Sequence, residues 1–128
     1  MIYGAATDRR PVMVTFKKDF VPFRVKPGFL RVSRKFGESP EIVLINDTVF
    51  PVEFRFPDDL MLDPKTGKCV TSAPLTPKGT ASATMELDVN DKYKGGNTTE
   101  PYDVCVFVVP NYCIDASGGS RPEVDIKP

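Results

Sequence analysis

Three cysteines, Cys69, Cys105 and Cys113, are the side chains of this sequence best suited to redox or metal chemistry. An odd number leaves at least one thiol free or paired with another chain. Cys105 and Cys113 flank a break at Pro110-Asn111, so a bond between them would close a small loop. Such a disulfide needs the two Cα atoms to approach within roughly 4.4 to 6.8 Å, and its formation would indicate export to an oxidising compartment.

Three interpretations of the cysteines remain open. Cys105 and Cys113 are buried thiols that pack as small hydrophobes, or they form the disulfide that we predict between them. In the third interpretation they join Cys69 in holding a soft metal ion such as Cu(I). A thiol-based metal carrier or redox protein that uses Cys105 and Cys113 is therefore one alternative function.

The sequence contains no histidine, the side chain that most often acts as a general base near neutral pH. Its absence also removes the Ser/His/Asp and Cys/His arrangements that activate a nucleophile. An enzyme would have to use carboxylates, Lys, Tyr or a bare thiolate, and no motif arranges these groups. We therefore predict no catalytic residue and no cofactor, with a carboxylate-based hydrolase or lyase as a further alternative.

The charge balance argues against polyanionic partners. Lys plus Arg and Asp plus Glu both number 17, so no net field draws the chain to nucleic acid. No apolar run is long enough to span a membrane, and the N-terminus lacks the apolar core of a signal peptide. Either the protein is cytoplasmic, or residue 1 follows a removed signal or anchor, in which case a periplasmic or extracellular location is favoured.

Short strands must position these side chains. The 128 residues match a single domain over residues 1–128, and 13 prolines with 9 glycines interrupt any long helix. Apolar and polar side chains alternate in short runs between turn residues, as in strands with one buried face. Strands are predicted at residues 12–16, 21–25, 29–33, 42–45, 52–56, 80–88, 104–109 and 123–127.

Three of these regions carry a more specific expectation. In residues 80–88, Ala81, Ala83, Met85 and Leu87 share one face. Residues 42–45 and 104–109 are apolar on both faces, which predicts central strands covered on both sides. Residues 57–74 show no strand pattern and predict one helical turn near 58–62 within a long loop. About eight strands and one long excursion predict an all-β fold, a Greek-key sandwich.

Three segments occur in the order found in the cupredoxin-like sandwich: EIVLINDTVFPVEFRF, PLTPKGTASATMEL and PYDVCVFVVPNYCIDASGGSRPEVDIKP. The first resembles the strand, asparagine turn and strand that bring in the first copper histidine. Its Asn46-Asp47-Thr48 also fits the N-glycosylation pattern, although Asn46 equally suits a turn. The other two resemble the approach to a later strand and the final strand, loop and strand. This resemblance implies a cupredoxin-like Greek key over roughly residues 40–128, with an immunoglobulin-like or major-sperm-protein-like sandwich as the alternative.

The copper function of that family does not carry over. A type 1 copper site needs two imidazoles, a thiolate and a weak axial ligand. Pro51 and Val52 stand where the first histidine belongs, and no His or Met follows Cys105 in the loop. The resemblance thus implies a cupredoxin-like domain without copper or electron transfer, of the kind that serves in recognition or assembly.

Surface aromatic and basic residues are the candidate contacts. Phe20, Phe23 and Phe36 lie beside turns, where alternation does not oblige them to be buried. Arg24 and Arg31 are predicted on neighbouring strands and would form a basic face. We therefore predict a non-catalytic module that binds a protein partner or another copy of itself through this surface or an open strand edge.

Overall fold

The alternating runs fold into strands that form three hydrogen-bonded sheets, in a computed structural model that describes residues 9–18, 20–93, 96–118 and 120–128. The first sheet has the order β2 (Phe23–Lys26), β1 (Arg10–Phe16), β4 (Glu41–Asp47), β8 (Thr84–Val89) and β6 (Met61–Leu62). The second is β11 (Tyr112–Asp115), β10 (Asp103–Val109), β5 (Val52–Arg55) and β7 (Ser72–Leu75). The third is β3 (Phe29–Ser33), β12 (Glu123–Lys127) and β9 (Thr98–Pro101), and a short 3-10 turn, η1 (Asp91–Tyr93), follows β8. The predicted all-β sandwich is confirmed.

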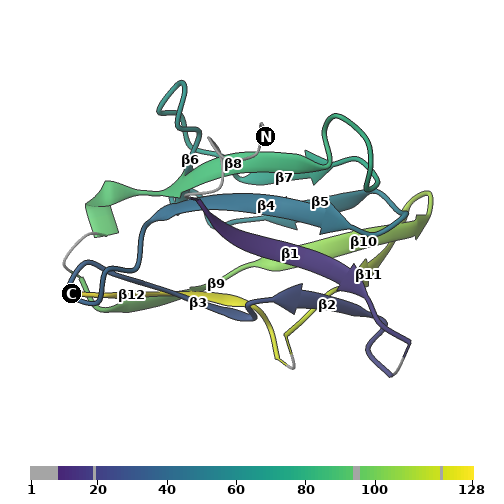
Figure 1. Cartoon of the computed structure of the whole chain (residues 1–128), viewed down its shortest axis with the longest axis horizontal. Helices are drawn as coiled ribbons and strands as arrows, with labels where there is room; N and C mark the ends of the chain where they lie inside the picture. Colours follow the sequence, from purple (N-terminus) through teal and green to yellow (C-terminus); the bar gives the residue numbers. More distant parts are fainter. Residues whose placement is uncertain (1–8, 19, 94–95, 119) are drawn as a thin grey trace.

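Two of the strand pairs are parallel. Strand β1 runs alongside β4 from Arg10 opposite Ile42 to Thr15 opposite Asp47, and β3 runs alongside β12. The remaining ladders are antiparallel. Because β1 and β4 point the same way, the residues after both strands lie at one end of the sandwich, and the C-terminus lies at the other end (Figure 1).

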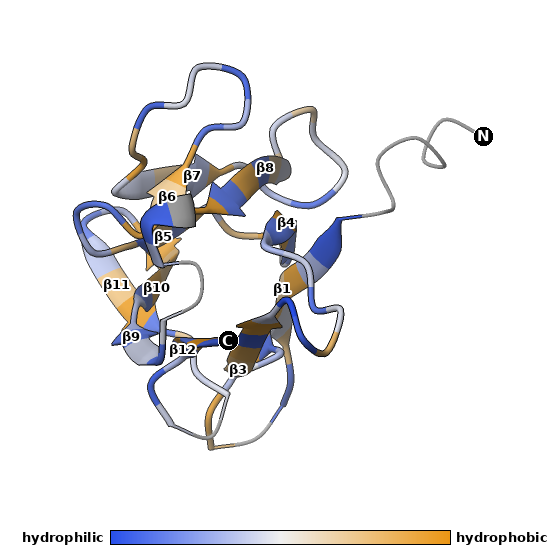
Figure 2. Cartoon of the chain, turned by 90° about the vertical axis from the view of Figure 1, so that its left-hand side faces the viewer, coloured by the Kyte–Doolittle hydropathy of each residue, from blue (hydrophilic) through white to orange (hydrophobic). Residues whose placement is uncertain are grey.

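The inner faces of the sheets share one apolar core. Its best buried members, each at most 2% exposed, include Val12, Val14, Leu30, Ile42, Leu44, Val52, Phe54, Ala73, Leu75, Leu87, Val104, Val106, Val124 and Ile126. Burial of each large member contributes about 1.5 to 3 kcal/mol. Figure 2 looks along the strands from the C-terminal end and shows them arranged around this common interior.

Asn46 is the polar exception on the inner face of β4. Its side-chain amide donates to the carbonyls of Phe50 (2.7 Å) and Thr76 (3.0 Å). Its Oδ1 accepts from the backbone N–H and the hydroxyl of Thr48. Asn46 is 1% exposed, so it acts as a turn residue that ties the end of β4 to the segment after β7, and its buried amide is unsuited to glycosylation.

Several predicted boundaries differ from those observed, β9 and β11 were not predicted, and the prediction is most clearly wrong in two regions. The strand predicted at 80–88 begins at Thr84, because Thr80 donates to the carbonyl of Pro77 from both its N–H and its hydroxyl and closes a turn. Ala81 is therefore exposed. Within residues 57–74, expected to lack strands, β6 forms and β7 begins at Ser72, while the expected helical turn is a single hydrogen-bonded turn before β6.

The two strands expected to be buried on both faces differ in cover. Along β4 the burial alternates, because Val43 and Ile45 lie half-buried on the outer face of the sheet. Along β10 the consecutive residues 104–106 are all buried, as predicted, whereas Val108 and Val109 are exposed at its end.

The amide of Asn46 supplies the first test. We expect Asn46→Asp to destabilise the protein by at least about 3 kcal/mol at pH 7, because a buried carboxylate would face two carbonyl oxygens. Burial raises the pKa of the introduced carboxyl above its unfolded value of about 3.9, so the loss grows as the pH rises above that value. Urea unfolding at pH 4 and pH 7 measures both effects.

Asn97→Asp is the matched control, because Asn97 is exposed and its Oδ1 accepts from Lys127 Nζ. We expect this variant to unfold at nearly the same urea concentration as the unmodified chain at both pH values. Equal effects of the two substitutions would contradict the role given to Asn46.

Candidate functional site

The cysteine pair lies on the hairpin formed by β10 and β11. The register sets Cys105 opposite Asp115 and Phe107 opposite Cys113, so the two cysteines are diagonal neighbours on the outer face of the sheet. Their Cα atoms are 5.2 Å apart and a disulfide joins them. The predicted pairing of Cys105 with Cys113 is confirmed in geometry.

The tip of this hairpin projects apolar side chains into solvent. Its turn is Pro110-Asn111, and Asn111 has φ 65°, a left-handed conformation that asparagine tolerates. The register shifts just before the tip, which leaves Val108 as the extra residue of a β-bulge. As a result Val108, Val109 and Tyr112 are all exposed.

The outer face beside the disulfide is polar and internally bonded. Glu53 stands opposite Cys105 on the neighbouring strand. Its carboxylate accepts from the hydroxyl of Ser72 (2.5 Å) and from Arg55 Nε (2.7 Å). The Ser72 hydroxyl and then Arg55 lower the pKa of Glu53 against the opposing effect of burial. This carboxylate is therefore held in its charged form by its neighbours.

One potential metal-ligand group exists among the described residues. The ligand atoms of Cys105, Cys113 and Asp115 lie within 4.8 Å of one another. Sulfur atoms joined in a disulfide provide no thiolate, the form that binds metal, so this group has no soft ligand while the bond is intact. Cys69 is exposed, and its backbone forms an isolated β-bridge with Leu62 on a different hairpin. The three cysteines do not converge, so the three-thiolate interpretation is wrong for this structure.

The predicted aromatic contacts divide between surface and core. Phe20 and Phe36 are exposed, but their loops lie at opposite ends of the sandwich (Figure 1). The prediction for Phe23 is wrong. This residue is 2% exposed, because it starts the inward face of β2 and its ring packs edge-on against Phe16 (5.6 Å) and Phe50 (5.9 Å).

The predicted basic face does not form. Arg24 belongs to β2 and Arg31 to β3, strands of two different sheets. Arg24 donates to the carbonyl of Val21. Arg31 pairs with Glu38 at 2.6 Å, and its guanidinium lies 5.0 Å from the centre of the Phe36 ring. The prediction that these two cations share a face is therefore wrong.

A cluster that the sequence did not reveal replaces them. Among the described residues, eight large apolar side chains are exposed. Six of them lie in the strand ends and loops opposite the C-terminus, and we call these six the apolar end (Figure 1). They are Phe16, Phe20, Val49, Val108, Val109 and Tyr112. The unbroken apolar run from Val104 to Pro110 was the available signal for part of it.

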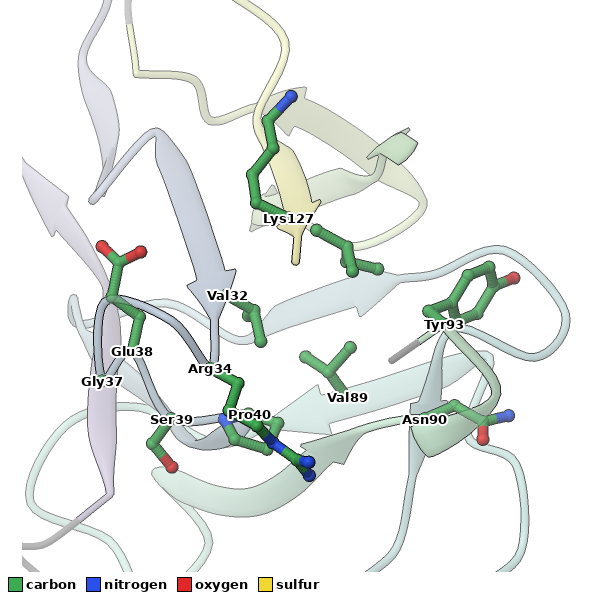
Figure 3. A pocket seen from close by; sticks show the side chains of 11 residues that line it. Val32, Arg34, Gly37, Glu38, Ser39, Pro40, Val89, Asn90, Tyr93 and Lys127 are labelled. Atoms are coloured by element: carbon green, nitrogen blue, oxygen red, sulfur yellow. The ribbon is translucent and has the colours of Figure 1, made fainter. Parts of the chain in front are cut away.

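A cavity of about 250 Å³ opens at the C-terminal end, between the third sheet and the end of β8 (Figure 3). Tyr93 and Asn90 form one wall. The Tyr93 hydroxyl donates to Asp59 at 2.5 Å, Lys92 also pairs with that carboxylate, and the Asn90 amide donates to the Asp59 carbonyl. The bond to Asp59, together with burial, raises the pKa of Tyr93 to about 12. Lys92 and Tyr93 lower the pKa of Asp59.

No protein family, curated protein or solved structure matches this chain. Within the described ranges, no helix has the length and apolar character needed to cross a bilayer. The functional argument therefore depends on the chain's own residues.

The cysteine pair predicts one reactive thiol per chain. Titration of the denatured, unreduced protein should find only the thiol of Cys69, and three thiols would contradict the disulfide.

The disulfide also predicts a change in stability. Because the bond spans 8 residues, loop entropy predicts that Cys105→Ser with Cys113→Ser costs roughly 2 to 3 kcal/mol of unfolding free energy. Cys69→Ser is the control and should leave the urea midpoint unchanged.

The carboxylate of Asp59 predicts a pH-dependent contribution to stability. Its lowered pKa means that this contribution is present at neutral pH and is lost as the pH falls through and below the ordinary aspartate value. Asp59→Asn should therefore lower the urea midpoint at pH 7, and the difference from the unmodified chain should shrink towards pH 2. Asp58→Asn, at the exposed neighbour, controls for charge alone, and an equal pH-dependent loss in this variant would contradict the role of Asp59.

Proposed function

We propose that this chain is a non-catalytic, cupredoxin-like binding or assembly module that contacts a protein partner or a second copy of itself. The observation that carries the proposal is the apolar end. Large apolar patches on soluble domains mark contact surfaces, and aromatic side chains are enriched in such contacts.

The contacts of the apolar end favour one continuous surface. The ring of Phe16 packs on Phe23, which packs on Phe50, the residue next to Val49. Backbone bonding then links this turn to the neighbouring hairpin, since the N–H of Phe107 donates to Pro51 O at 2.9 Å. These contacts connect the end of β1, the turn after β4 and the β10–β11 hairpin, which supports their acting as one surface.

Binding through addition of a strand at an open sheet edge is less well supported than binding through the apolar end. The outer side of β2 already pairs with the segment after β11, since Val25 N–H donates to Ser117 O and Ser117 N–H donates to Phe23 O. On β3, the Arg10 guanidinium donates to the carbonyl of Arg31 at 2.6 Å. Backbone groups at these edges are therefore engaged, which favours recognition by side chains.

Carboxylate catalysis has weak support in the cavities. The cavity of Figure 3 has one lining carboxylate, Glu38, and it pairs with Arg31. A second cavity, of about 410 Å³ beside β8, contains Asp63 and Glu86. Asp63 accepts from the N–H of Lys65, and Glu86 lies 3.4 Å from Arg9 Nε. These contacts favour structural roles.

A thiol-based carrier or redox protein is the second candidate, and the grouping of Cys105, Cys113 and Asp115 is the observation in its favour. It requires the disulfide to be reduced first. Native mass spectrometry after reduction and addition of Cu(I) or Zn(II) tests it: metal that is retained, and lost on alkylation, would favour this candidate over the binding module.

The binding proposal predicts association through the apolar end. In sedimentation velocity, Phe20→Ser with Val109→Ser should weaken self-association at least about tenfold, because buried aromatic contacts carry a large share of interface energy. Phe36→Ser, at an aromatic that is also exposed (63%, against 104% for Phe20) and lies at the other end, is the control and should have no effect. A chain that stays monomeric at all concentrations would contradict assembly with a second copy, and equal effects of both variants would contradict the assigned surface.

A further inference from the structure

The cavity at the C-terminal end has an apolar floor. Val32 of β3 and Val89 of β8 line it, with Pro40 at the loop that enters β4 (Figure 3). Ile126 of β12 also belongs to its lining. Val89 and Ile126 are almost completely buried, whereas Val32 is half-buried. An apolar body placed here would contact three strands from two sheets.

The rim carries one charge that the described residues leave uncompensated. Glu38 is neutralised by Arg31 at 2.6 Å. Lys127 donates to Asn97 Oδ1 at 2.7 Å and lies 3.5 Å from Asp125 Oδ1. The guanidinium of Arg34 forms neither a hydrogen bond nor an ion pair with any described residue, and it lines the cavity. Arg34 is therefore the lining cation that has no polar partner among the described residues.

The neutral polar groups of the wall are already engaged. The hydroxyl of Tyr93 and the amide of Asn90 both donate to Asp59. These bonds hold the wall in place and leave the Tyr93 ring as an apolar side of the cavity. Arg34 is consequently the main group available to orient a ligand, through paired N–H donors that match a carboxylate.

The volume limits the size of the ligand. A cavity of about 150 Å³ accepts benzene, and drug-sized ligands occupy roughly 300 to 1,000 Å³. At about 250 Å³, this cavity fits one aromatic ring or a short branched chain with a small polar group. One uncompensated cation also suits a monoanion better than a polyphosphate, which needs several cations.

We propose that this cavity binds a small amphipathic monocarboxylate, with its apolar body against Val32, Val89 and Ile126 and its carboxylate on Arg34. The site is separate from the apolar end and does not depend on the proposed function. The arrangement resembles small-molecule sites in general, where apolar walls give affinity and a few polar groups give orientation.

The test uses 4-phenylbutyrate and its neutral counterpart 4-phenylbutanol as probes, titrated into the whole chain and followed by amide chemical shifts. We expect saturable shifts in residues that line the cavity, with the carboxylate bound at least about fivefold more tightly than the alcohol. Arg34→Gln should remove this preference and leave the affinity for the alcohol unchanged. Lys35→Gln, at the adjacent exposed cation outside the lining, is the control and should retain the preference.

A second variant separates binding from folding. Val32→Phe should fill the opening and weaken both probes at least about tenfold, and its thermal melt reports whether the fold is intact; if it fails to fold, Arg34→Gln alone decides. The proposal is overturned if neither probe gives saturable shifts up to about 20 mM, well above the millimolar affinity expected of so small a ligand. It is equally overturned if the shifts map away from the cavity, or if Arg34→Gln and Lys35→Gln behave alike.

Discussion

Cover on both faces of β10 is the constraint on which the rest of the structure depends. Val104 and Val106 pack into the shared core, while Cys105 on the opposite face is bonded to Cys113 of the adjacent strand. β5 and β11 occupy its two edges. With its faces and edges fixed in this way, β10 ends in a hairpin tip whose bulge turns Val108 and Val109 outward. One half of the strand is therefore buried, and the other half is exposed at the hairpin tip.

The alternation of apolar and polar side chains predicted those strands whose own sequence shows it. Residues 29–33 and 123–127 were predicted with the observed bounds of β3 and β12. Strand β7 was missed because Ala73 and Pro74 have low strand propensity, and its place comes from pairing with β5, where Ala73 stands opposite Phe54. That information lies in residues about twenty positions away and is absent from the local pattern.

The same reasoning explains the mixed result for the candidate site. The pairing of Cys105 with Cys113 could be predicted because the two residues are close in sequence on either side of a turn. A hairpin at that turn places them next to each other. Phe23 was placed on the surface because it follows a turn, but its facing is set by the register that pairs it with Phe16 on β1. A slip of one residue reverses the facing of a strand, so the sequence alone could not decide whether Phe23 lies in the core or in solvent.

The two ends of the sandwich differ in chemistry. One end presents aromatic and aliphatic side chains, and the other presents a small cavity lined in part by Arg34. The sequence contains no histidine, and the proposals made above for the two ends both rest on shape and apolar contact.

Site-specific photo-crosslinking tests the central claim most directly. A photoreactive phenylalanine analogue at position 20 samples the apolar end, and the same analogue at position 36 samples another exposed position at the opposite end. The account predicts defined adducts, with a second copy or with a partner protein, from position 20 and none from position 36. Adducts that form equally from both positions, or only from position 36, would contradict it.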